Sequence, residues 1–368
     1  MDIAALHAAY AQGFESPESV VAAIYHRIES EGLRPVWISI VPREQALARA
    51  KALAKEDRSK LPLYGIPFAV KDNIDVAGMA TTAACPEYSY TAKESATVVT
   101  RLEQAGAILI GKTNMDQFAT GLVGTRTPYG VCSSVFDKRC ISGGSSAGSA
   151  VAVASGLVSF SLGTDTAGSG RVPAMFNNLI GLKPTRGVVS THGVVPACRT
   201  LDCVSIFAET AHDAALVLAT AKGYDANDPY SRAPRSGGGA SPWAGAESFR
   251  FGVPAPEALE FFGDEHNPKM YQDAVEALKA AGGVAVEFDL RPFLETAQLL
   301  YKGPWVAERY AAISTFIDAH RNDMDPTVQK IITGATNYSA VDTFKAAYKL
   351  ETLRRLTEPT WKAIDMML

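Results

Sequence analysis

Residues 142–170 read SGGSSAGSAVAVASGLVSFSLGTDTAGSG, and this stretch gives the strongest indication of the fold. Fifteen of its 29 residues are Gly or Ser, a composition typical of flexible linkers. The order of the residues argues against a linker, because the apolar run AVAVASG and the strand-like run VSFSLG lie between two polar ends. The stretch therefore predicts two serine-bearing turns that a helix and a strand bring together.

Strand-like and helix-like segments alternate on both sides of this stretch. IPFAV at 66–70 is typical of an apolar strand and AILI at 107–110 of a buried strand, and ATVVTRLEQAGA at 96–107 is typical of a helix. Ser16 followed by Pro17 marks the start of an earlier helix. The alternation predicts an α/β fold with a mixed, largely parallel central sheet covered by helices on both faces.

The 368-residue chain is 47% hydrophobic and 20% charged, with a formal net charge of −4. That charge gives no reason to expect a nucleic-acid partner. We expect no membrane partner either, because no run approaches the roughly 20 apolar residues of a membrane helix. Five scattered cysteines without a CxxC pair, and a start without signal-peptide features, predict a cytoplasmic protein. The six histidines form no HExxH or other close pair of ligands, so we expect no metal and no other cofactor.

Residues 106–113, GAILIGKT, fit the P-loop pattern GxxxxGK[ST]. A P-loop has its strand before the first glycine and uses the following residues as an open phosphate cradle. Here the residues at 107–110 are themselves a predicted strand, and Gly106 is better explained as the end of a helix. Nucleotide binding is therefore not favoured.

Residues 144–148, GSSAG, fit GxSxG with Ser146 as the nucleophile. That motif belongs after a buried hydrophobic strand. The preceding SSVFDKRCISG at 133–143 is polar and charged, and the late histidines offer no obvious partner. A Ser-His-Asp hydrolase is therefore not favoured.

Lys71 follows the apolar run at 66–70, so we expect its side chain inside the protein. Loss of hydration there favours the neutral amine and makes lysine a usable base. A serine hydroxyl is a poor nucleophile until a neighbouring base takes its proton. Ser145 and Ser169 lie in glycine-rich turns, whose free N–H groups can stabilise an oxyanion. A Ser-Ser-Lys relay is chemically sensible, although such turns also serve backbone geometry alone.

Three segments together resemble the amidase signature family: IPFAVKDNID at 66–75, SGGSSAGSA at 142–150 and GTDTAGSGRVPAMFNNLIGLKPTRG at 163–187. The resemblance implies the family's fold and its amide hydrolysis by a Ser-cisSer-Lys triad. Ser169 would be the acylated nucleophile, Ser145 the bridging serine and Lys71 the base. The spacing also matches, since Ser145 lies 74 positions after Lys71 and 24 positions before Ser169.

The same resemblance implies roles for the residues of the turn at 165–171. The oxyanion hole would be formed by the backbone N–H groups of Thr166, Ala167, Gly168 and Ser169. The Asp165 and Arg171 side chains would brace the turn as an ion pair.

The details of this turn resemble the allophanate hydrolase subgroup. Most of the family has glycine and isoleucine where this chain has Ala167 and Gly170. In that subgroup a tyrosine, and an arginine eight positions later, bind the substrate carboxylate; LYKGPWVAER at 300–309 supplies Tyr301 and Arg309. A small anionic amide such as allophanate fits this pair, because arginine makes paired, charge-assisted hydrogen bonds to carboxylates.

The resemblance covers residues 2–368, and we expect one amidase signature domain over residues 1–368. Family members continue beyond IDMML at 364–368, so we expect the domain to lack its C-terminal strands and the family's additional C-terminal domain. We expect the protein to be a cytoplasmic homodimer that releases ammonia from allophanate. Two alternatives stay open: another amidase signature enzyme, such as a tRNA-dependent amidotransferase component or a small-amide amidase, and an inactive truncated fragment.

Overall fold

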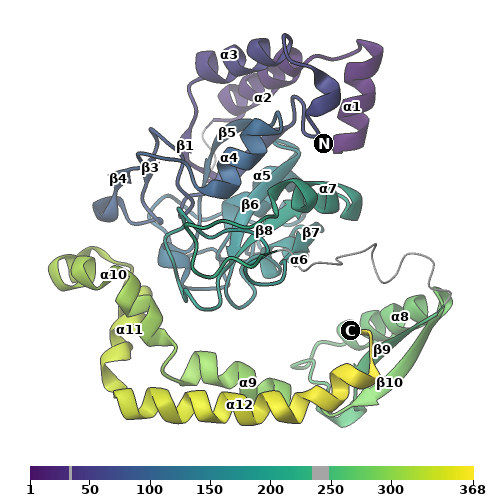
Figure 1. Cartoon of the computed structure of the whole chain (residues 1–368), viewed down its shortest axis with the longest axis vertical. Coiled ribbons are helices and arrows are strands. Elements are labelled where there is room, and N and C mark those ends of the chain that lie inside the picture. Colours follow the sequence, from purple (N-terminus) through teal and green to yellow (C-terminus); the bar gives the residue numbers. More distant parts are fainter. Residues whose placement is uncertain (33–34, 234–247) are drawn as a thin grey trace. The chain divides into compact units, whose positions relative to one another are not determined.

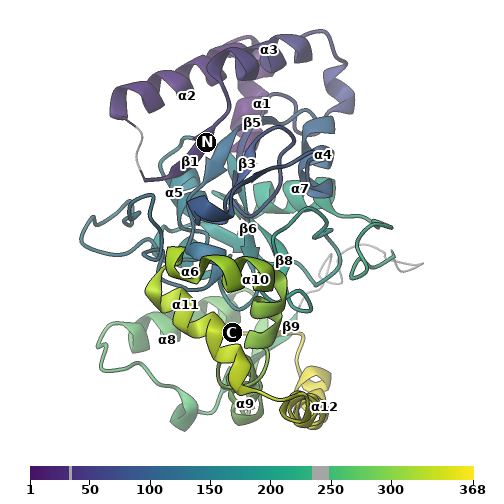
Figure 2. The same cartoon turned by 90° about the vertical axis from the view of Figure 1, so that its left-hand side faces the viewer.

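The computed structural model describes residues 1–32, 35–233 and 248–368. The chain divides into two compact units, and each is described here by itself. The first unit consists of Met1–Pro234 together with Glu308–Thr333, and the second of Arg235–Ala307 together with Gly334–Leu368. Figures 1 and 2 show the elements of each unit in two views.

The strands of the first unit are β1 (Trp37–Ile40), β2 (Pro67–Lys71), β3 (Ala80–Thr81), β4 (Tyr90–Thr91), β5 (Ile108–Thr113), β6 (Phe160–Asp165), β7 (Ile180–Leu182) and β8 (Cys203–Ala208). Its helices are α1 (Ile3–Gln12), α2 (Pro17–Glu31), α3 (Arg43–Leu53), α4 (Thr97–Gln104), α5 (Ala147–Ala154), α6 (Val172–Phe176), α7 (Ala211–Ala221), α11 (Pro326–Thr333) and all but the first two residues of α10 (Val306–His320).

The main sheet has six strands in the order β1-β5-β2-β6-β8-β7. Strand β2 pairs parallel with both β5 and β6. Strands β1, β8 and β7 run antiparallel to their neighbours. The expected mixed sheet is therefore confirmed, with its parallel pairing confined to the three strands at the centre.

Helices cover the sheet on both faces (Figure 2), as expected. Helix α5 packs against β2, β5, β6 and β8, while α7 packs against β7 and β8 and also contacts α4. The expected helix start at Ser16 is confirmed as well: Ser16 and Ser19 form a reciprocal capping box, and Pro17 is the first residue of α2.

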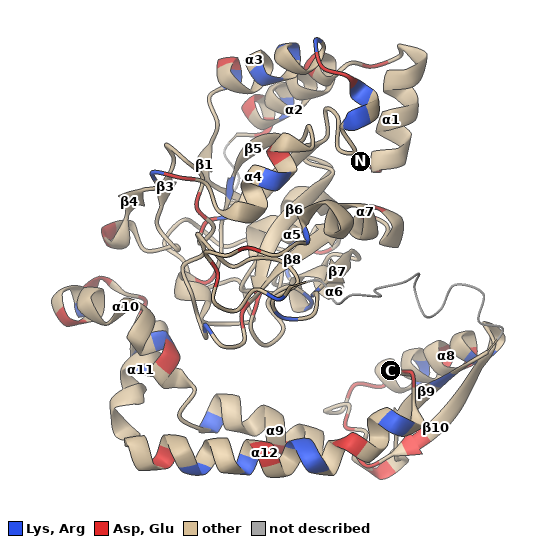
Figure 3. Cartoon of the chain, in the orientation of Figure 1, with Lys and Arg blue, Asp and Glu red and all other residues tan. Residues whose placement is uncertain are grey.

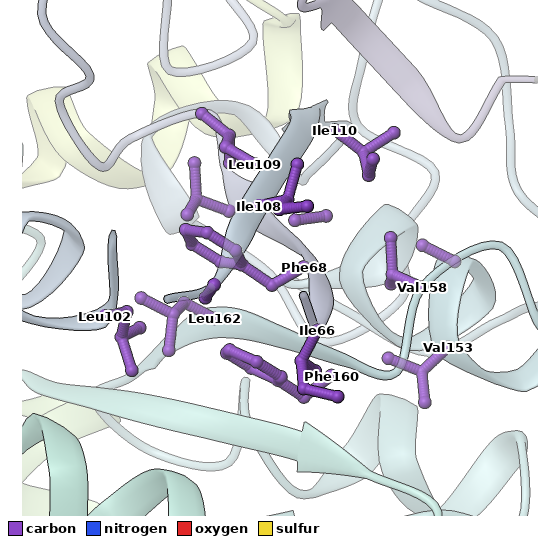
Figure 4. Close-up of a cluster of buried hydrophobic side chains, with 14 of the residues drawn as sticks. Ile66, Phe68, Leu102, Ile108, Leu109, Ile110, Val153, Val158, Phe160 and Leu162 are labelled. Atoms are coloured by element: carbon purple, nitrogen blue, oxygen red, sulfur yellow. The ribbon is translucent and has the colours of Figure 1, made fainter. Parts of the chain in front are cut away.

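The core of this unit lies against the central strands. The rings of Phe68 on β2 and Phe160 on β6 stack with centroids 5.2 Å apart, and Ile108, Leu102 and Leu162 surround them (Figure 4). Strand β2 is buried over its whole length, which carries its last residue into the interior together with the apolar ones. This burial brings a lysine into the core.

The match to the P-loop pattern is explained by this arrangement. Strand β5 occupies Ile108–Thr113, so the residues between the two glycines of GAILIGKT are strand and offer no phosphate cradle. Gly106 follows Ala105, the C-cap of α4, with a φ of +96° that suits glycine at a helix end.

The elements of the second unit are β9 (Phe249–Pro254), α8 (Asn267–Ala280), β10 (Gly283–Phe288), α9 (Arg291–Lys302), α12 (Ala340–Ala363) and β11 (Met366–Met367). Its sheet has three parallel strands in the order β10-β9-β11. Helix α8 packs against β10, and α9 packs against α12. Acidic and basic residues are interspersed along α12 (Figure 3), a pattern typical of a solvated helix face. Met366 and Met367 form the short β11, which pairs parallel with β9 and is half-buried.

Candidate active site

Lys71 and Ser145 meet in the interior of the first unit. The Nζ atom of Lys71 lies 2.7 Å from the Oγ atom of Ser145, and both side chains are completely buried. Lys71 is the last residue of β2, and Ser145 lies in the turn that precedes α5. The peptide bond between Gly144 and Ser145 is cis. Two residues proposed for the relay are thus in direct contact.

The environment of Lys71 makes its amine a base near neutral pH. Burial lowers the pKa of Lys71 to about 7, because the charged form loses its hydration. The carboxylates of Asp116, Asp202 and Asp165 act in the opposite direction, and the charge of Arg309 lowers the pKa further. A neutral lysine amine has a lone pair and can accept a proton from a hydroxyl group.

Thr164 is a second partner of Lys71 that the sequence did not reveal. The Nζ atom of Lys71 donates to the Oγ1 atom of Thr164 at 2.8 Å, and the side-chain amide of Asn73 approaches the same oxygen at 3.3 Å. With one amine hydrogen directed at Thr164, the lone pair of the neutral amine can point toward Ser145. Only their positions in the sequence could have pointed to these neighbours of Lys71: Thr164 is at the polar end of the buried strand β6, and Asn73 is two residues after Lys71.

Ser169 lies in the second turn, between β6 and α6, and is 5% exposed. Among the described residues its hydroxyl contacts the Gly121 carbonyl, at 3.4 Å, and makes no hydrogen bond to Ser145. That contact is long, so the hydroxyl can turn to another acceptor at little cost.

The four N–H groups expected in the oxyanion hole differ in their contacts. The N–H of Gly168 donates to the Oδ1 atom of Asp165 at 2.7 Å, so it is already engaged in this structure. Within the described part of the chain, the N–H groups of Thr166 and Ser169 make no hydrogen bond to protein. These two groups are available to a negatively charged oxygen, and the role of the full set stays a prediction.

Asp165 and Arg171 form the ion pair expected of them. Arg171 donates from Nε and Nη2 to the two oxygens of Asp165, at 2.9 Å and 3.1 Å. Asp165 also accepts from the N–H groups of Gly168 and Gly170, and so holds the turn on both sides of Ser169. Burial alone would raise the pKa of Asp165, but the hydrogen bonds and charge of Arg171 and the two backbone donors lower it. The carboxylate stays ionised and can brace the turn.

Ser146 makes no hydrogen bond to Lys71 in the described part of the chain. Its hydroxyl donates to the carbonyl oxygen of Thr164 at 3.3 Å, and the residue is the N-cap of α5. No strand leads into the turn before it, because the only regular pairing in residues 131–146 is a single bridge between Ser133 and Ile141. The GxSxG match is therefore not a nucleophile elbow.

Arg309 lies near the base, on α10. Its Nη1 atom donates to the Ala119 carbonyl at 3.2 Å and to the Oγ1 atom of Thr120 at 3.0 Å. In the described part of the chain, Nε and Nη2 make no hydrogen bond, so one edge of the guanidinium is open. Burial raises the pKa of Asp202, and the positive charge of Arg309 partly opposes that rise. This open edge has the geometry that binds a carboxylate through two parallel hydrogen bonds.

Tyr301 belongs to the second unit. It lies on α9 and is 61% exposed within the described residues. Its expected role beside Arg309 stays a prediction.

No group of three or more His, Cys, Asp or Glu side chains in the described ranges could hold a metal ion. Over the same residues, no helix combines the length and apolarity required to cross a bilayer.

A buried lysine in contact with a serine, beside a second serine-bearing turn, is the arrangement that the resemblance to amide-cleaving enzymes implies. Residues 19–362 match the Amidase family. The chain belongs to that family.

Three relatives within the family illustrate which of its members this chain is similar to. The chain is 49% identical over 346 residues to the urea amidolyase of Saccharomyces cerevisiae, a match that covers 90% of this chain and 18% of that protein. The allophanate hydrolase of Kluyveromyces lactis is 42% identical with a TM-score of 0.90, covering 100% of this chain and 60% of that one. A glutamyl-tRNA(Gln) amidotransferase component from Prosthecochloris aestuarii is 42% identical over 220 residues, which is 59% of this chain and 46% of that protein. This chain thus spans less than a fifth of the length of the yeast urea amidolyase.

Proposed function

We propose that this chain is an amide hydrolase that releases ammonia from allophanate, with Ser169 as nucleophile, Ser145 as proton relay and Lys71 as base. The observation that carries the proposal is the 2.7 Å contact between the buried Nζ atom of Lys71 and the Oγ atom of Ser145. A lysine without solvent and with a pKa of about 7 is suited to proton transfer.

The first half of the reaction forms an acyl-enzyme. The neutral amine of Lys71 takes the proton of Ser145 as Ser145 takes the proton of Ser169. The Oγ atom of Ser169 then attacks the carbonyl carbon of the terminal amide, and the carbonyl oxygen becomes an oxyanion. The proton returns along the same relay to the amide nitrogen, the C–N bond breaks and ammonia leaves.

The second half restores the enzyme. Water gives a proton to the relay and attacks the acyl carbon, the ester bond to Ser169 breaks, and Ser169 regains its proton. The second product is N-carboxycarbamate. The free N–H groups of Thr166 and Ser169 support stabilisation of the oxyanion in both halves, because preorganised donors act strongly where water is excluded.

Selection of allophanate is assigned to Arg309 and Tyr301. Allophanate is a small anion, and the open Nε–Nη2 edge of Arg309 is complementary to its carboxylate. The similarity to urea amidolyase and to allophanate hydrolase supports this substrate over neutral amides.

The decisive experiment measures ammonia release from allophanate by the 368-residue chain. We expect turnover, and we expect Ser169→Ala to remove it. Ammonia release that survives Ser169→Ala undiminished would overturn the assignment of the nucleophile. A chain that turns over malonamide or glutamine but not allophanate would overturn the assignment of the substrate.

An amidotransferase-type activity is the second candidate, favoured by the 42% identity to a glutamyl-tRNA(Gln) amidotransferase component over 59% of the chain. A panel of allophanate, malonamide and glutamine separates the two, because only the first carries a carboxylate directly beside the amide system that reacts. Lack of turnover on all three would instead favour the inactive fragment.

We also propose that the two units act as one domain, in a cytoplasmic homodimer. The five cysteines, four of them buried, form no disulfide, as is usual for a protein of a reducing compartment. A single cooperative melt of the whole chain would support one domain, and sedimentation velocity would test the dimer.

A further inference from the structure

Glu308 directly precedes Arg309 and is bound to a single residue of a neighbouring loop. Its Oε2 atom accepts from the backbone N–H of Thr200 at 2.8 Å, and its Oε1 atom accepts from the hydroxyl of the same residue. Both oxygens of one carboxylate are therefore occupied by the two donors of one threonine. Two such bonds fix a direction as well as a distance, and hydrogen bonds to a charged acceptor are stronger than neutral ones.

The loop that carries Thr200 is itself fixed to the Ser169 turn. The N–H groups of Leu201 and Asp202 both donate to the Cys198 carbonyl, at 2.8 Å and 2.9 Å, which closes a tight loop. The buried carboxylate of Asp202 then accepts from the Oγ1 atom of Thr166 at 2.5 Å. One short loop thus contacts the start of α10 at one point and the turn that carries Ser169 at another.

The hydrogen bonds of Arg309 itself go to neutral groups. Its Nη1 atom binds two neutral acceptors, on Ala119 and Thr120, and within the described residues no carboxylate pairs with it. Farther along α10, Ile313 and Ile317 pack in an apolar cluster with Phe118. Those contacts hold the helix body, whereas Glu308 holds the first turn, where Arg309 is attached.

We propose that Glu308 is a positioning residue that sets the guanidinium of Arg309 at a fixed place relative to Ser169, and so determines preference for anionic amides. The proposal rests on the proposed function, in which Arg309 binds the substrate carboxylate. Glu308 touches neither substrate nor the reacting atoms. It acts through the first turn of α10, the loop at 198–202 and the Thr166–Asp202 contact.

The test compares steady-state ammonia release from allophanate and from malonamide by the whole chain and five variants. Glu308→Ala is expected to raise KM for allophanate about tenfold, with kcat within about twofold and malonamide kinetics unchanged, as expected for lost uniform binding. Glu308→Gln is expected to recover most of the affinity, because an amide can accept from the N–H of Thr200 and donate to its hydroxyl. The control Glu44→Ala, an exposed acidic residue of α3, should leave both substrates unaffected.

The remaining variants distinguish the positioning role of Glu308 from the binding of the substrate carboxylate by Arg309. Arg309→Ala is expected to raise KM for allophanate, and adding Glu308→Ala to it should change nothing further, because the residue being positioned is gone. If Arg309→Ala raises KM and Glu308→Ala does not, the positioning role is wrong and the carboxylate assignment stands. If Arg309→Ala itself leaves KM unchanged, the carboxylate assignment fails and the positioning role fails with it.

If Glu308 only stabilised the fold, its substitution would affect the kinetics of both substrates alike. Equal losses of kcat for both substrates in Glu308→Ala would overturn the proposal. If that variant does not fold, Thr200→Val serves in its place, since it removes the hydroxyl donor and keeps the backbone one. It is expected to raise KM for allophanate about threefold, and an unchanged KM would count against the proposal.

Discussion

The Nζ atom of Lys71 and the Oγ atom of Ser145 lie 2.7 Å apart although 74 positions separate the two residues in the sequence. The contact forms because Lys71, the last residue of β2, and Ser145, in the turn before α5, are both buried in the interior of the first unit. A hydrogen bond between two fully buried groups is not exchanged for bonds to water, so each partner depends on the other.

Ser145→Ala is expected to lower kcat by at least about a thousandfold, since members of a catalytic relay act as a unit. The neighbouring Ser146→Ala is the matched control, because the Ser146 hydroxyl binds the Thr164 carbonyl and not the lysine. We expect its kcat to stay within about threefold of wild type. Ammonia release from allophanate measures both, and equal losses in the two variants would contradict the roles given to these serines.

The pH dependence should report the amine of Lys71. The base must be neutral, and its pKa is about 7, so kcat/KM should rise with pH through about 7 and level off above it. Below the pKa the active fraction falls about tenfold per pH unit. The measurement is a kcat/KM profile between about pH 5 and 9 at constant ionic strength. A profile that still rises about tenfold per pH unit at pH 9, as a base with the ordinary lysine pKa of about 10.4 would give, would be incompatible with a buried neutral base.

Arg309→Ala should move that same profile. The positive charge of Arg309 lowers the pKa of Lys71, so its removal should raise the pKa and shift the acidic limb to higher pH. Malonamide is the suitable substrate, because its binding does not require the guanidinium. Arg309→Lys keeps the charge and should leave the limb in place, while still losing affinity for allophanate. A limb that does not move in Arg309→Ala would mean that solvent screens the two charges from each other.

Gly170→Ala should destabilise the Ser169 turn. A methyl group at this position would lie 2.3 Å from the Oγ atom and 2.4 Å from the Cβ atom of Ser205. Overpacking of this kind typically costs about 1–3 kcal/mol of unfolding free energy. Thermal melting and kcat should both fall.

Ser205→Gly provides the check on this explanation. The hydroxyl of Ser205 is buried and has no hydrogen-bond partner among the described residues, so its removal breaks no hydrogen bond. The double variant Gly170→Ala/Ser205→Gly should recover part of the lost melting temperature. No recovery would show that the methyl group added at position 170 is not what strains the turn.

Much of the fold could be predicted from the order of apolar and polar residues. Burial patterns revealed β2 and β5, and the Ser16–Pro17 signal revealed the start of α2, because these features depend on neighbours a few positions away. The antiparallel pairing of β8 with β6 could not be predicted, because it depends on which strand end the chain returns to after a long connection. The division into two units depends on contacts between residues far apart and was not visible either.

For the candidate site, the sequence by itself determined the residue types and their spacing: a lysine at the end of an apolar strand and two serines in glycine-rich turns. Only the tertiary structure decided which groups meet. It placed Ser145 and not Ser146 against Lys71, added Thr164 as a second partner, and tied Glu308 to Thr200 across 108 positions. The physical reason is that a hydrogen bond requires atoms within about 3 Å in a defined direction. Sequence patterns specify which residues face the interior, whereas the packing of whole elements specifies their directions.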